Sequence, residues 1–246
     1  MRKTNFLNIP IDCISMYETL EKVKNAINLK QQIHHAVVNA GKIILMQNDK
    51  ELEKSVLEAD IINADGQAVV WAANLFGIKI PERVAGIDLM QNLVELSFKK
   101  KYKCFFLGAK QVVVENLVQI YEKKFSANII AGYRNGYFND DDELKIAQSI
   151  SESGANILFV AISSPKKEIF LNKYKQQLSN VNFIMGVGGS FDVIVGRIKR
   201  APKLIQNLGL EWFFRFCQEP RRMWKRYLIG NTKFILLVIR AYFTRK

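Results

Sequence analysis

The chain has 246 residues, of which 49% are hydrophobic and 24% are charged, and its formal net charge at pH 7 is +13. This length and apolar content suffice for one large domain, or for a domain with an appendage, and they argue against general disorder. The three cysteines, Cys13, Cys104 and Cys217, lie far apart without a CxxC pair, which argues against a disulfide framework or a zinc site and favours a reduced, cytosolic setting.

Two features near the start of the chain bear on its class. The first residues, MRKTNFLNIPIDCI, lack the apolar core of a signal peptide, and no stretch reaches the roughly 18 apolar residues of a spanning helix. We therefore expect a soluble or surface-bound protein.

The only histidines, His34 and His35, are adjacent, whereas metal ligands on one face need i, i+2 or i, i+4 spacing. They are expected to serve an ordinary role at the entry of a strand.

Short apolar runs alternate with amphipathic stretches along most of the chain. This alternation predicts an α/β fold with a Rossmann-like, mostly parallel sheet and helices on both faces. The runs expected to form strands are 35–39, 60–63, 104–107, 128–131, 157–161 and 183–187. The stretches expected to form helices are 41–47, 67–76, 112–125, 141–151, 166–177 and, less clearly, one from 191 onward.

The ends of the expected strands carry glycine, asparagine, serine and aspartate. These residues suit the turns between strands and helices for conformational reasons alone. Because the carboxyl ends of parallel strands meet at one edge of a sheet, where ligands bind in such folds, the five loops also predict a shared cleft. The loops read VVNAG (37–41), NADG (63–66), FLGAK (106–110), AISSPKKE (161–168) and MGVGGSFD (185–192).

Asp65, in NADG, stands where a buried strand gives way to a helix. A carboxylate at such a junction can cap the helix or act as a general base, and the local sequence leaves both roles open. The MGVGGSFD loop suits a phosphate at a helix N-terminus. The third glycine of a dinucleotide fingerprint would fall at Phe191, which argues against NAD. The absence of GK[ST] excludes a P-loop. A mononucleotide, a nucleotide-sugar diphosphate, or simply a tight turn remains open.

Two further motifs can be explained by structural roles alone. Asp140 and Asp142 resemble the Asp-x-Asp of metal-dependent glycosyltransferases, but they lie directly before a helix, where acidic side chains cap free N–H groups. We therefore expect helix capping and no essential metal. In AISSPKKE, Ser164 is expected to be the N-cap of a helix that begins at Pro165. The lysines that follow either meet a phosphate or are simply solvated.

The basic charge is concentrated in the tail. Residues 197–246 carry thirteen basic and two acidic residues, a net charge of +11, whereas residues 1–196 carry 23 basic and 21 acidic residues. Segments 209–217 and 224–241 mix aromatic and aliphatic residues with cations, which is typical of an interfacial helix on an anionic membrane. The alternatives are a core-packing helix with a solvated charged face, and single-stranded nucleic acid binding. Confinement of the charge to the tail argues against nucleic acid.

The ordered motifs NADG, PERVAGIDL, FFLGAK, SSPKKE, MGVGGSFDVIVGRIKRAP, GLEWFFR and EPRR resemble the WecG/TagA/CpsF glycosyltransferases over about residues 8–233. The resemblance implies a catalytic α/β domain, residues 1–196, and a membrane-targeting appendage, residues 197–246. It implies an inverting transfer, without metal or other cofactor, of N-acetylmannosamine from a UDP-sugar to N-acetylglucosamine on a polyprenyl diphosphate. The products would feed teichoic acid or other surface polysaccharides. The enzyme would work at the inner face of the cell membrane, and a homo-oligomer is compatible with this.

The resemblance also implies roles for individual residues. Asp65 matches the family's proposed general base, and Arg83 matches an arginine credited with the active site; an ion pair of Arg83 with Glu82 or a neighbour is the alternative. Arg215, Arg221 and Arg222 are candidates to bind the acceptor diphosphate. The other candidate substrate-binding residues are Asn39, Gly66, Gly108, Ser164, Lys167, Gly186, Gly188, Gly189 and Asp192.

Two positions depart from the family pattern. Val37 stands where relatives usually carry threonine, and Lys167 where they usually carry glutamine. These departures put the donor sugar in question, and a different UDP-hexose is the alternative. A nonenzymatic membrane or nucleic-acid-binding protein is a further alternative, against which UDP binding that depends on residues 186–189 would count.

Overall fold

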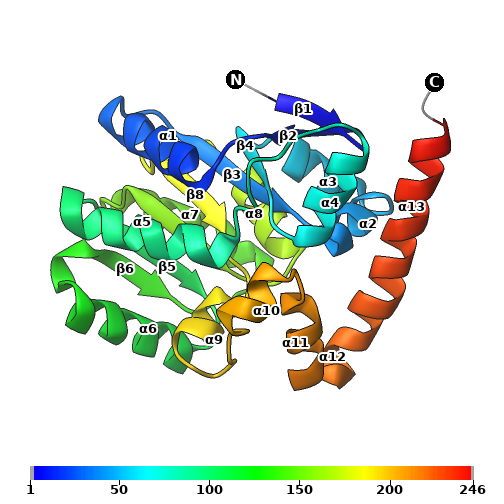
Figure 1. Cartoon of the computed structure of the whole chain (residues 1–246). Helices are drawn as coiled ribbons and strands as arrows, with labels where there is room; N and C mark the ends of the chain where they lie inside the picture. The colour runs from blue at the N-terminus through cyan, green and yellow to red at the C-terminus, as the bar shows by residue number, and fades with distance from the viewer. Residues whose placement is uncertain (1–2, 245–246) are drawn as a thin grey trace.

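The computed structural model describes residues 3–244, without the side chains at positions 222, 225 and 226. Its centre is a six-stranded sheet in the order β4-β3-β8-β7-β5-β6 (Figure 1). Every neighbouring pair is parallel. The six expected runs are confirmed as strands: β3 (Ile33–Val38), β4 (Ile61–Ala64), β5 (Cys104–Gly108), β6 (Ile130–Arg134), β7 (Ile157–Ala161) and β8 (Phe183–Gly186).

A short antiparallel hairpin precedes the sheet and packs beside β4. Its strands are β1 (Lys3–Phe6) and β2 (Ile9–Asp12). The buried carboxylate of Asp12 accepts the backbone N–H of Ile62 at 2.9 Å, which fastens the hairpin to the main sheet. Burial raises the pKa of Asp12 above its ordinary value, although the hydrogen bond from Ile62 opposes this shift.

Helices cover both faces of the sheet, as the alternation predicts. Three clusters of buried apolar side chains lie between the helices and the strands. One face carries α1 (Met16–Asn28), α5 (Gly86–Lys100), α6 (Gln111–Lys124) and α9 (Ser190–Ile194). The other carries α7 (Glu143–Glu152) and α8 (Lys166–Lys173). Around the β3–β4 end lie α2 (Ala40–Met46), α3 (Lys50–Leu57) and α4 (Gln67–Leu75), and short 3₁₀ turns occur at η1 (Ala127–Ile129) and η2 (Asp140–Asp142).

Helix α1 was not among the expected elements, although its start carries a clear local signal. The Ser15 hydroxyl accepts the N–H of Glu18, and the Glu18 carboxylate accepts the N–H of Ser15, which is a capping box. Helices α3 and α5 were also not expected. Helix α8 ends at Lys173, four residues before the expected end at position 177.

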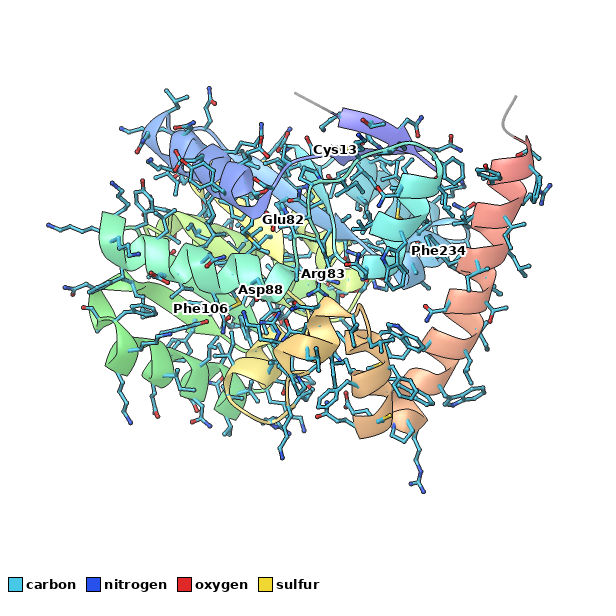
Figure 2. All side chains as sticks on the ribbon, viewed as in Figure 1. Cys13, Glu82, Arg83, Asp88, Phe106 and Phe234 are labelled. Atoms are coloured by element: carbon cyan, nitrogen blue, oxygen red, sulfur yellow. The ribbon has the colours of Figure 1, made fainter. Side chains whose placement is uncertain are left out.

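The C-terminal segment folds as helices that return to the body. They are α10 (Lys203–Asn207), α11 (Glu211–Gln218), α12 (Pro220–Trp224), a π-helical turn η3 (Lys225–Ile229) and α13 (Gly230–Thr244). Helix α13 runs beside α2, and its Phe234 and Val238 are buried in the cluster around β3 and β4 (Figure 2). Other apolar residues of α13 face outward: Ile235 is 56% exposed and Leu236 60%. Within residues 3–244, none of the helices combines the length and the apolar character that a bilayer-crossing segment needs.

The connections create a switch point between β3 and β8. The chain leaves β3 through α2 toward β4, on one side. It leaves β8 through α9, on the other side, where the ring of Phe191 packs against that of Phe106 in β5 with centroids 6.0 Å apart. Adjacent parallel strands whose connections diverge leave a crevice above their carboxyl ends.

Candidate active site

The carboxyl ends of β3 and β4 bring Asn39 and Asp65 together. The backbone N–H of Asp65 donates to the carbonyl oxygen of Val38 at 2.8 Å, which extends the strand pairing beyond β4. A Cβ atom built on Gly66 would lie 3.3 Å from Cβ of Asn39, so the two turns are in contact. The N-cap of α4 is Gly66, and Asp65 precedes it. Asp65 is therefore not the N-cap residue, and it lies partly exposed at the crevice.

Asn39 also has a structural role. It is the N-cap of α2, and its Oδ1 accepts the backbone N–H of Lys42 at 3.0 Å. This hydrogen bond fixes the side chain at the end of β3. Contact between Asn39 and a substrate stays a prediction.

Arg83 lies beside the end of β4, 18 residues after Asp65 in sequence. The next residue, Val84, donates its backbone N–H to the carbonyl oxygen of Ala64 at 3.1 Å. The alternative to an active-site role was an ion pair of Arg83 with Glu82 or a neighbour (Figure 2). Glu82 is not the partner found, and its carboxylate accepts the N–H of Met16. The Arg83 guanidinium binds Glu211 of α11, with Nη1 2.8 Å from Oε2.

The glycine-rich turn after β8 lies on the opposite side of the crevice. Val187 donates its N–H to Val160 of β7 at 2.8 Å, and Gly188 has a φ of +53°, which favours glycine. A Cβ atom on Gly189 would lie 2.9 Å from Nη2 of Arg215. The turn thus brings a guanidinium from the C-terminal segment against its backbone. Close packing and anion binding both fit this geometry, so UDP binding here stays a prediction.

Below this turn lies a buried cluster of charges. Glu168 Oε1 lies 2.6 Å from Nζ of Lys42 and 2.6 Å from Nζ of Lys167, and the three side chains are 6 to 9% exposed. Burial raises the pKa of Glu168, but the two lysines outweigh burial and hold it at about 2. A Cβ atom on Gly186 would lie 2.9 Å from Cδ of Lys167. The expectation of a solvated lysine is therefore wrong for Lys167.

Three other expectations around this cluster need correction. Ser164 is not the N-cap of α8: the cap position is Pro165, and the Ser164 hydroxyl donates to Oε2 of Glu168 at 2.9 Å. Neither Asp140 nor Asp142 makes the capping hydrogen bond expected of it. Asp140 instead binds Nζ of Lys166 at 2.9 Å. A strong basic partner was available nearby, and it competes with the helix for the carboxylate.

The histidines are the second and third residues of β3, near its start. Both are buried, and His35 Nε2 lies 2.9 Å from Oδ1 of Asn63 on β4. Burial lowers the pKa of His34 to about 3 and that of His35 to about 4. Among the described residues, no group of three or more histidine, cysteine, aspartate or glutamate side chains could hold a metal ion.

The remaining candidate residues differ in whether they lie near the crevice. Arg215 reaches the crevice at Gly189, whereas Arg221 is exposed. The side chain of Arg222 lies outside the described residues. Gly108 ends β5, with a φ of +134° and its Cα against the backbone of Ala161.

Asp192, at the start of α9, lies 3.7 Å from Arg197. The sequence alone did not indicate four charged residues near the candidate site: Lys42, Glu168, Arg200 and Glu211. Charged residues on amphipathic helices or in a basic tail are usually exposed to solvent, so the sequence gives no sign that these four are paired inside the fold.

A doubly wound parallel sheet with a carboxylate, an arginine and a glycine turn near its switch point has the architecture of an α/β protein that binds a ligand at the carboxyl ends of its strands. A family model described as "Glycosyl transferase WecG/TagA/CpsF family" matches residues 4–246, and the chain belongs to this family of glycosyltransferases. It is 35% identical over 195 residues, 79% of this chain and 74% of the relative, to the N-acetylglucosaminyldiphosphoundecaprenol N-acetyl-beta-D-mannosaminyltransferase of Bacillus spizizenii (strain W23). The predicted family and its enzymatic character are confirmed.

Proposed function

We propose that this glycosyltransferase moves N-acetylmannosamine from UDP to N-acetylglucosamine on a polyprenyl diphosphate, with inversion at the anomeric carbon. The proposal is carried by the placement of Asn39, Asp65 and the backbone next to Arg83 at the ends of β3 and β4, in a chain 35% identical to a transferase named for this reaction. The lipid-linked disaccharide would feed the synthesis of teichoic acid and other surface polysaccharides.

In the proposed mechanism Asp65 acts as the general base. Its carboxylate takes the proton of the acceptor hydroxyl as the oxygen attacks the anomeric carbon of the donor. The bond between that carbon and the β-phosphate oxygen breaks, and UDP leaves with the electron pair. The guanidinium of Arg83 stabilises the charge that builds on the diphosphate. A single displacement converts an α-linked donor into a β-linked product.

The C-terminal helices supply the proposed contact with the membrane. Trp212, Phe213 and Trp224 are exposed on α11 and α12, and Ile235 and Leu236 on α13, in the segment with a net charge of +11. Apolar side chains and cations together suit an anionic lipid surface. The lipid-linked acceptor lies at the same surface. Salt-sensitive binding to anionic vesicles, without binding to oligonucleotides, would support this against the nucleic-acid alternative.

The donor sugar is the less constrained part of the proposal. Val37 and Lys167 differ from the usual family residues, and both contribute to the neighbourhood of Gly186 at the crevice. A hydroxyl is missing at position 37, and a buried cation stands at position 167. A different UDP-hexose is therefore the second candidate donor, in the same class of reaction.

The test is acceptor-dependent release of UDP in the presence of EDTA. The substrates are UDP-N-acetylmannosamine and a lipid-diphosphate N-acetylglucosamine, and the wild type is compared with Asp65→Asn. Loss of the base should lower kcat by roughly 10²- to 10⁴-fold. Asp49→Asn is the matched control, because Asp49 is the N-cap of α3 and asparagine caps equally well. Full activity in Asp65→Asn would refute the base, and a wild type inactive with any UDP-sugar would refute the function.

A further inference from the structure

Helix α11 bridges the two sides of the crevice. Gly209, just before it, packs so closely on the first turns of α4 that an added Cβ atom would lie 2.7 Å from Cγ of Gln67. Glu211, at its first turn, binds Arg83 beside the end of β4. Arg215, one turn later, lies against Gly189 after β8. Residues i and i+4 share one face of a helix, so Glu211 and Arg215 present one face of α11 to the crevice.

Glu211 also forms an ion pair with a second arginine. Its Oε1 lies 3.5 Å from Nε of Arg200. Both terminal nitrogens of Arg200 bind the carboxylate of Asp88 on α5, at 2.6 and 2.7 Å, a bidentate geometry that fixes a guanidinium firmly. The hydrogen bond to Asp88, opposed by burial, raises the pKa of Arg200. The four side chains alternate in charge from Asp88 through Arg200 and Glu211 to Arg83.

We propose that Glu211 is a positioning residue for Arg83, and that Asp88 and Arg200 position Glu211 in turn. This inference rests on the proposed function. It gives a carboxylate of the C-terminal segment an indirect role in stabilising the transition state of the proposed glycosyl transfer. A lone arginine side chain has many rotamers, and ordering it during the reaction costs free energy. Glu211 orders Arg83 beforehand, so the guanidinium already lies beside the end of β4 when UDP departs.

The geometry favours positioning over blocking. Only Nη1 of Arg83 contacts Glu211, and a guanidinium has five N–H donors, so donors remain for a diphosphate. Glu211 has a second cationic neighbour, because its other oxygen lies 3.5 Å from Nε of Arg200 in an ion pair without a hydrogen bond. A carboxylate that only blocked Arg83 would have to leave this second partner before every turnover.

The test uses the full chain with acceptor in anionic vesicles. Glu211→Gln keeps the shape and removes the charge, and we expect kcat to fall roughly 10- to 100-fold because Arg83 is misplaced. The KM for the UDP-sugar should change less than twofold, since the loss lies in the transition state. Glu95→Gln is the matched control: Glu95 forms an exposed pair with Lys99 on α5 at 2.6 Å.

A double-mutant cycle separates positioning from a general effect on α11. If Glu211 acts through Arg83, then Glu211→Gln should cost less than twofold in an Arg83→Ala background. Vesicle binding and the melting temperature should match the wild type. A wild-type kcat in Glu211→Gln, an increased kcat, or additive losses in the double mutant would each overturn the inference. An inactive wild type would overturn the proposed function and this inference with it, whereas an active wild type with a fully active Glu211→Gln overturns the inference alone.

Discussion

The buried cluster of Lys42, Glu168 and Lys167 makes a sharp prediction about stability. Glu168→Gln removes one negative charge and leaves two ammonium groups buried, at 7 and 9% side-chain exposure. Breaking a buried ion pair by removing one partner typically costs about 3 to 5 kcal/mol. The pKa of Glu168, about 2 against an ordinary 4.5, corresponds to about 3 kcal/mol on its own. The two routes agree, and we expect a loss of about 3 kcal/mol.

The chain contains its own control. Glu143 also lies between two lysines, 3.6 Å from Lys166 and 3.2 Å from Lys173. The Glu143 side chain is itself only 8% exposed, but the two lysine side chains are 35 and 53% exposed, so water can solvate the ammonium groups that Glu143→Gln leaves behind. Glu143→Gln should therefore cost no more than about 1 kcal/mol.

The assay is urea-induced unfolding followed by circular dichroism at pH 7, with both variants and the wild type. Equal losses in Glu168→Gln and Glu143→Gln would refute the reasoning from burial. The pH dependence gives a second check. Because the folded-state pKa is depressed, the advantage of the wild type over Glu168→Gln is complete above about pH 4.5 and shrinks as the pH falls toward 2.

Two further predictions concern the sheet. His34 and His35 are neutral in the folded chain, with pKa values of about 3 and 4 against 6.5, so the unfolded state binds more protons below pH 6.5. The free energy of unfolding, measured with urea, should therefore fall between pH 6.5 and 4 by up to about 1.4 kcal/mol per pH unit for each histidine; a value that does not change with pH would contradict this. Gly108→Ala would place Cβ 2.5 Å from the backbone of Ala161 at a φ of +134° and should lower stability by about 3 kcal/mol or more. Gly154→Ala, at a φ of +73° with open space around it, should cost only about 1 to 2 kcal/mol, and equal effects would argue against the close contact.

The sheet could be predicted from the sequence because its signals are local. Each strand is a short apolar run whose burial on both faces leaves few alternatives, as in residues 157–161, which are buried throughout β7. Turn residues then mark the carboxyl ends, and parallel topology brings those ends to one edge. The positions of Asp65 and of the turn at residues 186–189, at this edge of the sheet, could therefore be predicted without any knowledge of long-range contacts.

The charges of the site could not be predicted in the same way. Lys167 and Lys166 are adjacent in sequence, yet Lys167 is buried with Glu168 while Lys166 binds Asp140 near the surface. Which of two neighbouring lysines points inward depends on the rotation of α8 against the sheet, which no local pattern states. Ser164 was expected to cap the same helix, but the cap position is Pro165. The Ser164 hydroxyl donates to the carboxylate of Glu168, a charge-assisted hydrogen bond.

The pairing of Arg83 with Glu211 has a similar origin and a larger consequence. The two residues are separated by 128 positions, and each has opposite charges nearer in sequence. Arg83 binds Glu211 and not Glu82 because Glu82 accepts the free N–H at the start of α1. The same C-terminal segment that carries the excess positive charge thus returns a carboxylate to the crevice, one turn before Arg215. If the segment docks on lipid through its exposed aromatic residues, the same helix contacts the surface that holds the acceptor and also positions Arg83. Lipid contact and catalysis would then depend on one element, α11.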